Sequence, residues 1–168
     1  PVVLVTISAP PAIVQQPTPN TVLLGKNVDF KVSAAGTEPL SYQWYFGTNT
    51  AIADATNSIL TLLGVRDAEA GGYSVAIRSP FGSVTSGIAG LIVLPPPQLS
   101  IHWGTTGFEF SGVGVPGDTY WVQAATNLDE PVTWVTVATN VAGVDGLVRC
   151  ADTNAPVIPA RFFRLLSP

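Results

Sequence analysis

The sequence predicts an all-β protein made of two tandem β-sandwich domains, joined by a proline-rich linker and preceded by one extra strand. Short strand-like segments recur along the chain with Gly, Pro and Asn turn signals between them, which is the pattern of a sandwich. The 168 residues include 16 Gly and 15 Pro, too many for a helical bundle. Hydrophobic residues make up 46% of the chain, which excludes a disordered polymer.

The first part of the chain contains a regular series of predicted strands. Residues 28–32 alternate apolar and polar side chains, as a strand with one buried face must. Further strands are predicted at hairpin-like spacing over residues 42–46, 59–62, 73–77 and 83–93. A short helical turn is expected near residues 67–71, and no longer segment keeps a helical period.

Three consecutive prolines, Pro95, Pro96 and Pro97, interrupt this series. They lack backbone donors and favour a stiff, extended connector, so they predict a domain boundary. Strand patterns resume over residues 98–101, 107–111, 119–125, 133–139, 147–152 and 161–166. We therefore expect an extension strand over residues 1–9, a first sandwich over 10–95 and a second, smaller sandwich over 96–168.

The extension strand is almost entirely apolar or β-branched. Such a strand is an aggregation hazard unless its backbone pairs with a sheet edge. It is therefore a candidate assembly strand that adds to another copy, head to tail, and generates a filament. The alternative is that it belongs to a preceding domain of a longer protein, because residues 91–94 also lead into prolines. The candidate residues are Val2, Val3, Leu4, Val5 and Ile7.

Four motifs of the first sandwich occur together. They lie at residues 30–36, at 42–45 around Trp44, at 69–75 around Tyr73, and at 81–83. With these motifs, residues 10–95 resemble a bacterial immunoglobulin-like domain of the intermediate set. Relatives of this kind recur in tandem in surface and secreted proteins, which implies an extracellular or cell-surface location in a bacterium.

The resemblance also assigns core positions. It places Val32 and Val75 where the family has its disulfide, Trp44 as the central tryptophan, and Tyr73 as the tyrosine of the corner motif. Because Cys150 is the single cysteine, no internal disulfide can form. We expect these two valines to pack on Trp44 and so to offset the missing bridge.

The second unit resembles a short fibronectin-type-III-like module found at the C-terminus of similar proteins. The resemblance rests on residues 117–128, 133–134, Gly146 and 160–165. It implies a small sandwich and brings no chemistry with it.

Charge and composition exclude several partners. The net charge is −4 and the basic residues are scattered, so neither nucleic acid nor an anionic membrane surface is an expected partner. The apolar runs are about ten residues long, half of what a membrane span needs, so no membrane insertion is expected.

Catalytic and metal-binding patterns are also missing from the sequence. His102 and Cys150 are the only His and Cys, which excludes a structural zinc set. We expect His102 on the surface and Cys150 in the core. No calcium-loop motif is found among the acidic residues. We therefore expect no catalytic residue, no metal, no cofactor and no enzymatic activity.

The aromatic residues of the second unit leave one binding surface open. Tyr120 and Val122 share one face of a predicted strand, and Trp121 lies on the other as a candidate glycan face. Trp134 fits either that surface or the core. Two functions remain: a structural or adhesive module that contacts copies of itself or neighbouring domains of the same protein, and an accessory glycan-binding or spacer module of a larger secreted enzyme.

Overall fold

A computed structural model describes residues 8–104, 107–152 and 161–167. The chain divides into two compact units, Pro1–Val93 and Leu94–Pro168. Both consist of strands, and the one helical segment in the described ranges is the short 3-10 turn η1 (Asp67–Glu69). The predicted all-β class, with two tandem sandwiches, is confirmed.

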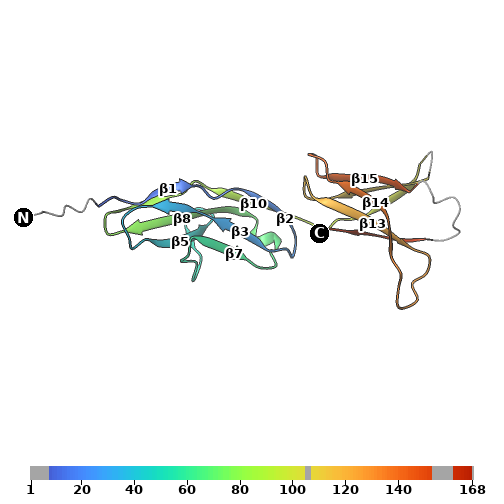
Figure 1. Ribbon diagram of the computed structural model, residues 1–168, viewed down its shortest axis with the longest axis horizontal. Coiled ribbons are helices and arrows are strands. Elements are labelled where there is room, and N and C mark those ends of the chain that lie inside the picture. The colour runs from blue at the N-terminus through green and yellow to red at the C-terminus, as the bar shows by residue number, and fades with distance from the viewer. Residues whose placement is uncertain (1–7, 105–106, 153–160, 168) are drawn as a thin grey trace, which may run out of the picture. The chain divides into compact units, whose positions relative to one another are not determined.

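The first unit packs a broad sheet against two strand pairs (Figure 1). The broad sheet has the order β2-β10-β8-β5-β6, with β9 also paired to β8, and the other pairs are β1-β4 and β3-β7. The strands are β1 (Ala12–Gln15), β2 (Asn20–Leu23), β3 (Val28–Lys31), β4 (Ser33–Ala35), β5 (Ser41–Phe46), β6 (Thr50–Ala51), β7 (Ile59–Leu62), β8 (Gly71–Ser79), β9 (Gly82–Thr85) and β10 (Ala89–Leu94).

Strand alternation fills the core of this unit. On β3, Val28 and Phe30 are buried while Asp29 and Lys31 are exposed, as the period of two requires. Trp44 and Val75 are directly opposite each other on β5 and β8. The resulting cluster of buried side chains comprises Val28, Phe30, Val32, Trp44, Ala55, Leu60, Val65, Tyr73, Val75, Ile77, Ala89 and Leu91.

The segment 83–93, expected as one strand, is divided into β9 and β10. Ser86 lies in the break and is the one buried polar side chain found in the described residues. Val75 donates its N–H to Ser86 Oγ (3.0 Å), and Ser86 donates its own N–H to the Val75 carbonyl (2.9 Å). The Ser86 side chain therefore takes a place in the ladder that a backbone carbonyl would otherwise occupy, and this interrupts the strand.

The chain enters and leaves the first unit at opposite ends of β8. Ala9 and Thr37 exchange two hydrogen bonds, of 2.9 and 3.1 Å, which fix the entering backbone. A Cβ added to Gly82 would lie 3.1 Å from Pro10 Cβ, so Pro10 packs beside Gly82, which pairs with the last residue of β8. The departing β10 pairs instead with the first residues of β8. Nine strand residues separate the two points by roughly 26 Å.

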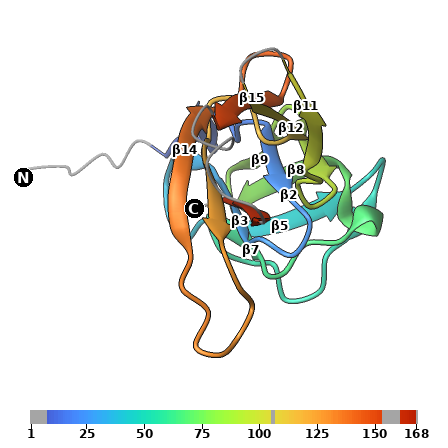
Figure 2. The same ribbon diagram turned by 90° about the vertical axis from the view of Figure 1, so that its right-hand side faces the viewer.

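The second unit is a sandwich of two three-stranded sheets, ordered β11-β12-β15 and β14-β13-β16 within the described ranges (Figure 2). Phe163 of β16 packs on Phe108 and Phe110 of β12, with ring centroids 5.8 and 4.8 Å away, so aromatic rings join the two sheets. The strands are β11 (Ser100–Trp103), β12 (Phe108–Val113), β13 (Thr119–Ala125), β14 (Val135–Val141), β15 (Leu147–Asp152) and β16 (Phe162–Leu166).

Candidate functional site

The four residues assigned to the first core lie in one buried cluster. Trp44 and Val75 have no exposed surface, and Val32 and Tyr73 are also buried. The Trp44 Nε1–H donates to the carbonyl of Asn57 at 2.9 Å, so the indole is satisfied although it is enclosed. These residues hold the sandwich together and present no group to a ligand.

Tyr73 joins this core to the turn before β8. Its hydroxyl donates to the carbonyl of Glu69 at 2.7 Å, and its ring stacks on Phe30 with a centroid distance of 4.8 Å. Burial of the phenol, with a smaller contribution from the Glu69 charge, raises the pKa of Tyr73 to about 12. The phenol therefore stays protonated well above the pH at which free tyrosine ionises.

The candidate assembly strand, Val2, Val3, Leu4, Val5 and Ile7, lies outside the described residues. The fixed point nearest to it is Ala9, held by Thr37. The assignment stays a prediction.

Trp121 lies near the middle of β13 on the face opposite the buried Tyr120 and Val122. It is half-buried, and its neighbours in register are Thr139 of β14 and Leu166 of β16. Trp121 therefore shares the outward face of the sheet with Gln123, two positions further along β13.

A row of three polar side chains crosses this face, one from each strand. Arg164 donates from Nε and Nη2 to Gln123 Oε1, at 2.9 and 2.7 Å, and Gln123 Nε2 donates to Thr136 Oγ1 at 3.2 Å. The Arg164 guanidinium also lies over the Trp134 ring, 4.3 Å from its centroid. This contact places Trp134 on the outward face, and we name Trp121, Gln123, Trp134, Thr136 and Arg164 the tryptophan–arginine face.

The sequence predicts Trp121 on this face and leaves Trp134 open between this face and the core. Gln123, Thr136 and Arg164 come together through strand register, which pairs Gln123 with both other residues. The available signal was Gln123, two positions after Trp121 and so on the same strand face, but it did not identify the partners.

His102 and Cys150 lie on the other sheet of the second unit. His102 Nε2 is 2.9 Å from Glu109 Oε2 in an exposed pair. Cys150 is half-buried rather than fully enclosed, and desolvation raises the pKa of its thiol, which disfavours the reactive thiolate. Both residues border a shallow hollow of about 320 Å³. Within the part of the chain that the structure describes, no three His, Cys, Asp or Glu side chains gather as a metal site.

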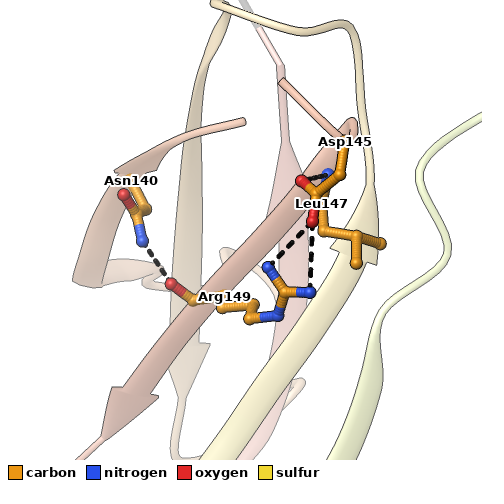
Figure 3. Close-up of polar contacts among 4 residues, drawn as sticks. All are labelled: Asn140, Asp145, Leu147 and Arg149. Atoms are coloured by element: carbon orange, nitrogen blue, oxygen red, sulfur yellow. Dashed lines mark hydrogen bonds and ion pairs between the residues drawn. The ribbon is translucent and has the colours of Figure 1, made fainter. Parts of the chain in front are cut away.

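The connection from β14 to β15 is tied by a charged turn (Figure 3). Asp145 Oδ1 accepts the N–H of Leu147 at 3.0 Å, and Asp145 Oδ2 lies 3.3 Å from both terminal nitrogens of Arg149. Asn140 donates its side-chain N–H to the Arg149 carbonyl. The Leu147 N–H above all, with Arg149, lowers the pKa of Asp145. The turn therefore favours the ionised form of Asp145, and the contacts of this carboxylate stabilise the connection between the two strands.

Comparisons with known proteins agree with this architecture. A family model described as an immunoglobulin domain matches residues 10–78. An I-band fragment of titin superposes with a TM-score of 0.50 at 19% identity, covering 95% of this chain and 65% of that one. A complex of titin M10 with an obscurin-like 1 Ig domain gives a TM-score of 0.49 at 23% identity, covering 55% of this chain and all of that one. Tandem Ig repeats of Dlar give 0.49 at 20% identity, covering 54% and 50%.

At these identities the likeness concerns the fold alone. The chain is a tandem β-sandwich protein, and it contains an immunoglobulin-like domain. Among the described residues, no helix is long and apolar enough to pass through a membrane.

Proposed function

We propose that this chain is a non-catalytic structural or adhesive module, one link in a series of sandwich domains at the surface of, or outside, a bacterial cell. The observation that carries the proposal is the path of the chain through the first unit, which enters at one end of β8 and leaves at the other. Domain termini often lie close together. A domain whose chain enters at one end and leaves at the other can instead act as a spacer between the segments before and after it.

In this function residues 1–9 are the linking strand, 10–95 the immunoglobulin-like domain and 96–168 a fibronectin-type-III-like module. Residues 2–7 precede the point where Ala9 is fixed, and they would pair with the sheet edge of a neighbouring sandwich. That neighbour is either a second copy of the chain, which gives a filament, or a preceding domain of a longer protein.

The first unit offers an edge for such a strand. In the described residues β7 pairs with β3 alone, so its other edge has no strand beside it. Ile59 on β7 is 45% exposed, and Leu63 just after it is 73% exposed. An unpaired strand edge with apolar side chains is a template for a further strand. A strand from residues 2–7 of another copy would cover both side chains.

Light scattering after size-exclusion chromatography tests self-assembly over a range of concentrations. The intact chain is expected to form a concentration-dependent series of assemblies, and a chain lacking residues 1–8 is expected to be a folded monomer. Ile59→Lys should weaken assembly at the acceptor edge, while Val14→Lys, at a site that is 70% exposed on β1, is the matched control. Assembly that survives the truncation, or an intact chain that is monomeric throughout, contradicts the filament.

A second candidate is an accessory glycan-binding module of a larger secreted enzyme. The observation that favours it is the tryptophan–arginine face of the second unit.

A further inference from the structure

We propose that the tryptophan–arginine face binds an acidic polysaccharide, with Arg164 pairing with a sugar carboxylate while Trp121 packs against a sugar ring. This inference goes beyond the structural role and does not depend on self-assembly, because the face belongs to the second unit and the candidate edge to the first.

The side chain that would receive the carboxylate is already held in place. Arg164 rests on the Trp134 ring, and two of its N–H groups point at Gln123 Oε1. A guanidinium has five N–H donors in a rigid plane and suits two-point binding of a carboxylate. Because the plane is fixed before the ligand arrives, less side-chain entropy is lost on binding.

The charge around Arg164 is unbalanced in favour of an anion. Arg149 and Lys31 each face a carboxylate, Asp145 and Asp29 respectively, whereas Arg164 forms no ion pair within the described residues. The outward positions of the sheet contain no acidic side chain; on register they are Thr119, Trp121, Gln123, Ala125, Thr136, Thr139, Val141, Phe162, Arg164 and Leu166. In a chain of net charge −4, the charged side chain at these outward positions is the cation of Arg164. Its attraction for a polyanion should be short-ranged and sensitive to salt.

The remaining groups favour a sugar chain over a small anion. Trp121 and Arg164 stand on neighbouring strands and two positions apart in register, which separates their Cα atoms by roughly 8 Å. This separation suits neighbouring sugars of one polymer rather than a single ring. Gln123, beside Arg164, and Thr136, on the other side of β13, supply amide- and hydroxyl-type hydrogen-bonding groups, and the Trp121 indole supplies an apolar surface. Trp134 holds Arg164 and so has a positioning role.

Affinity electrophoresis of the full chain, with polygalacturonate in the gel, tests the proposal. The wild-type chain should be retarded, and raising the salt concentration should abolish the retardation. Highly methyl-esterified pectin has largely the same backbone without most of the charge, and it should retard the chain far less. This comparison requires no variant and so does not depend on whether a substitution disturbs folding.

Variants then assign the residues. Arg164→Gln and Trp121→Ala should each weaken binding about tenfold or more, the value expected for a hydrogen-bonded charge or a buried ring contact. Arg164→Lys should recover part of the affinity, and Arg78→Gln, which removes an exposed charge from the first unit, should change nothing. The melting temperature of each variant checks its fold. Light scattering of Arg164→Gln should match the wild type, which separates this proposal from self-assembly.

Three results would overturn the inference. Equal retardation by polygalacturonate and the esterified polymer would remove the role of charge. Unchanged binding by a folded Arg164→Gln variant would place the site elsewhere. Binding to heparin with no binding to polygalacturonate would show that sulfate, and not a sugar carboxylate, is the group recognised.

Discussion

Replacing Tyr73 with phenylalanine removes one hydroxyl from the core of the first unit and so measures what that hydroxyl contributes to stability. The ring would keep its contacts with Phe30 and Phe46, whose centroids lie 4.8 and 5.1 Å away. Only the 2.7 Å hydrogen bond to the Glu69 carbonyl is lost. That carbonyl belongs to η1, which has no buried residue, so water can replace part of the bond. We expect Tyr73→Phe to lower the free energy of unfolding by about 1–2 kcal/mol at pH 7.

The same substitution should change the response to alkali. The folded chain keeps the Tyr73 proton until its pKa of about 12, whereas the unfolded chain releases it near pH 10. The stability linked to this phenol is therefore complete below pH 10 and is lost as the pH rises through 12. A phenylalanine side chain cannot ionise, so the stability curves of the variant and the wild type should converge between pH 10 and 12.

Urea unfolding followed by tryptophan fluorescence measures this effect. Trp44 is the one tryptophan in the first 93 residues, and the other three lie in the second unit, whose transition serves as an internal reference. Tyr45→Phe removes a hydroxyl from a half-buried ring of the same sheet and is the matched control. The reasoning fails if Tyr73→Phe leaves stability unchanged at pH 7, or if its deficit at pH 11.5 is as large as at pH 7.

Two further predictions concern a buried ring and a charged turn. Trp44→Ala should cost about 3–5 kcal/mol because it empties a fully buried site, and circular-dichroism melts showing under about 1 kcal/mol would refute this core assignment. Asp145→Asn should make the second unit less sensitive to acid: the lowered pKa of Asp145 stabilises the fold above the unfolded pKa, and this contribution is lost as pH falls through the lowered value. Identical urea midpoints for variant and wild type from pH 5 to pH 2 would contradict it.

The fold class could be predicted because strand alternation is a local property. In β3 and β13 the apolar residues at every second position indicate which strand face is buried. Examples are Val28 and Phe30 on β3, and Tyr120 and Val122 on β13. The resemblance to immunoglobulin-like domains added the identity of the central positions. Neither source needs knowledge of which strands are neighbours, so both could be applied to one sequence without a structure.

The break at Ser86 shows the limit of local reasoning. Residues 83–93 have strand chemistry on both sides of Ser86-Gly87, a dipeptide that is a local turn signal but does not show which group completes the ladder at the break. The break depends on a hydrogen bond between Ser86 Oγ and Val75, eleven positions away on another strand. Trp134 was ambiguous for the same kind of reason, since the residue that settles its face, Arg164, comes from a distant strand.

The tryptophan–arginine face depends on a β-bulge in β14 that the local sequence pattern does not predict. Val122 pairs with Ala138, but Gln123 pairs with Thr136, so Val137 is an extra residue without a partner on β13. A regular ladder would set Val137 opposite Gln123, and the polar row would then end at Gln123 because valine offers no hydrogen bond. The bulge instead brings Thr136 within 3.2 Å of the Gln123 amide, whose oxygen is thereby turned toward Arg164. The orientation of the proposed carboxylate-binding group thus rests on a one-residue shift in strand register.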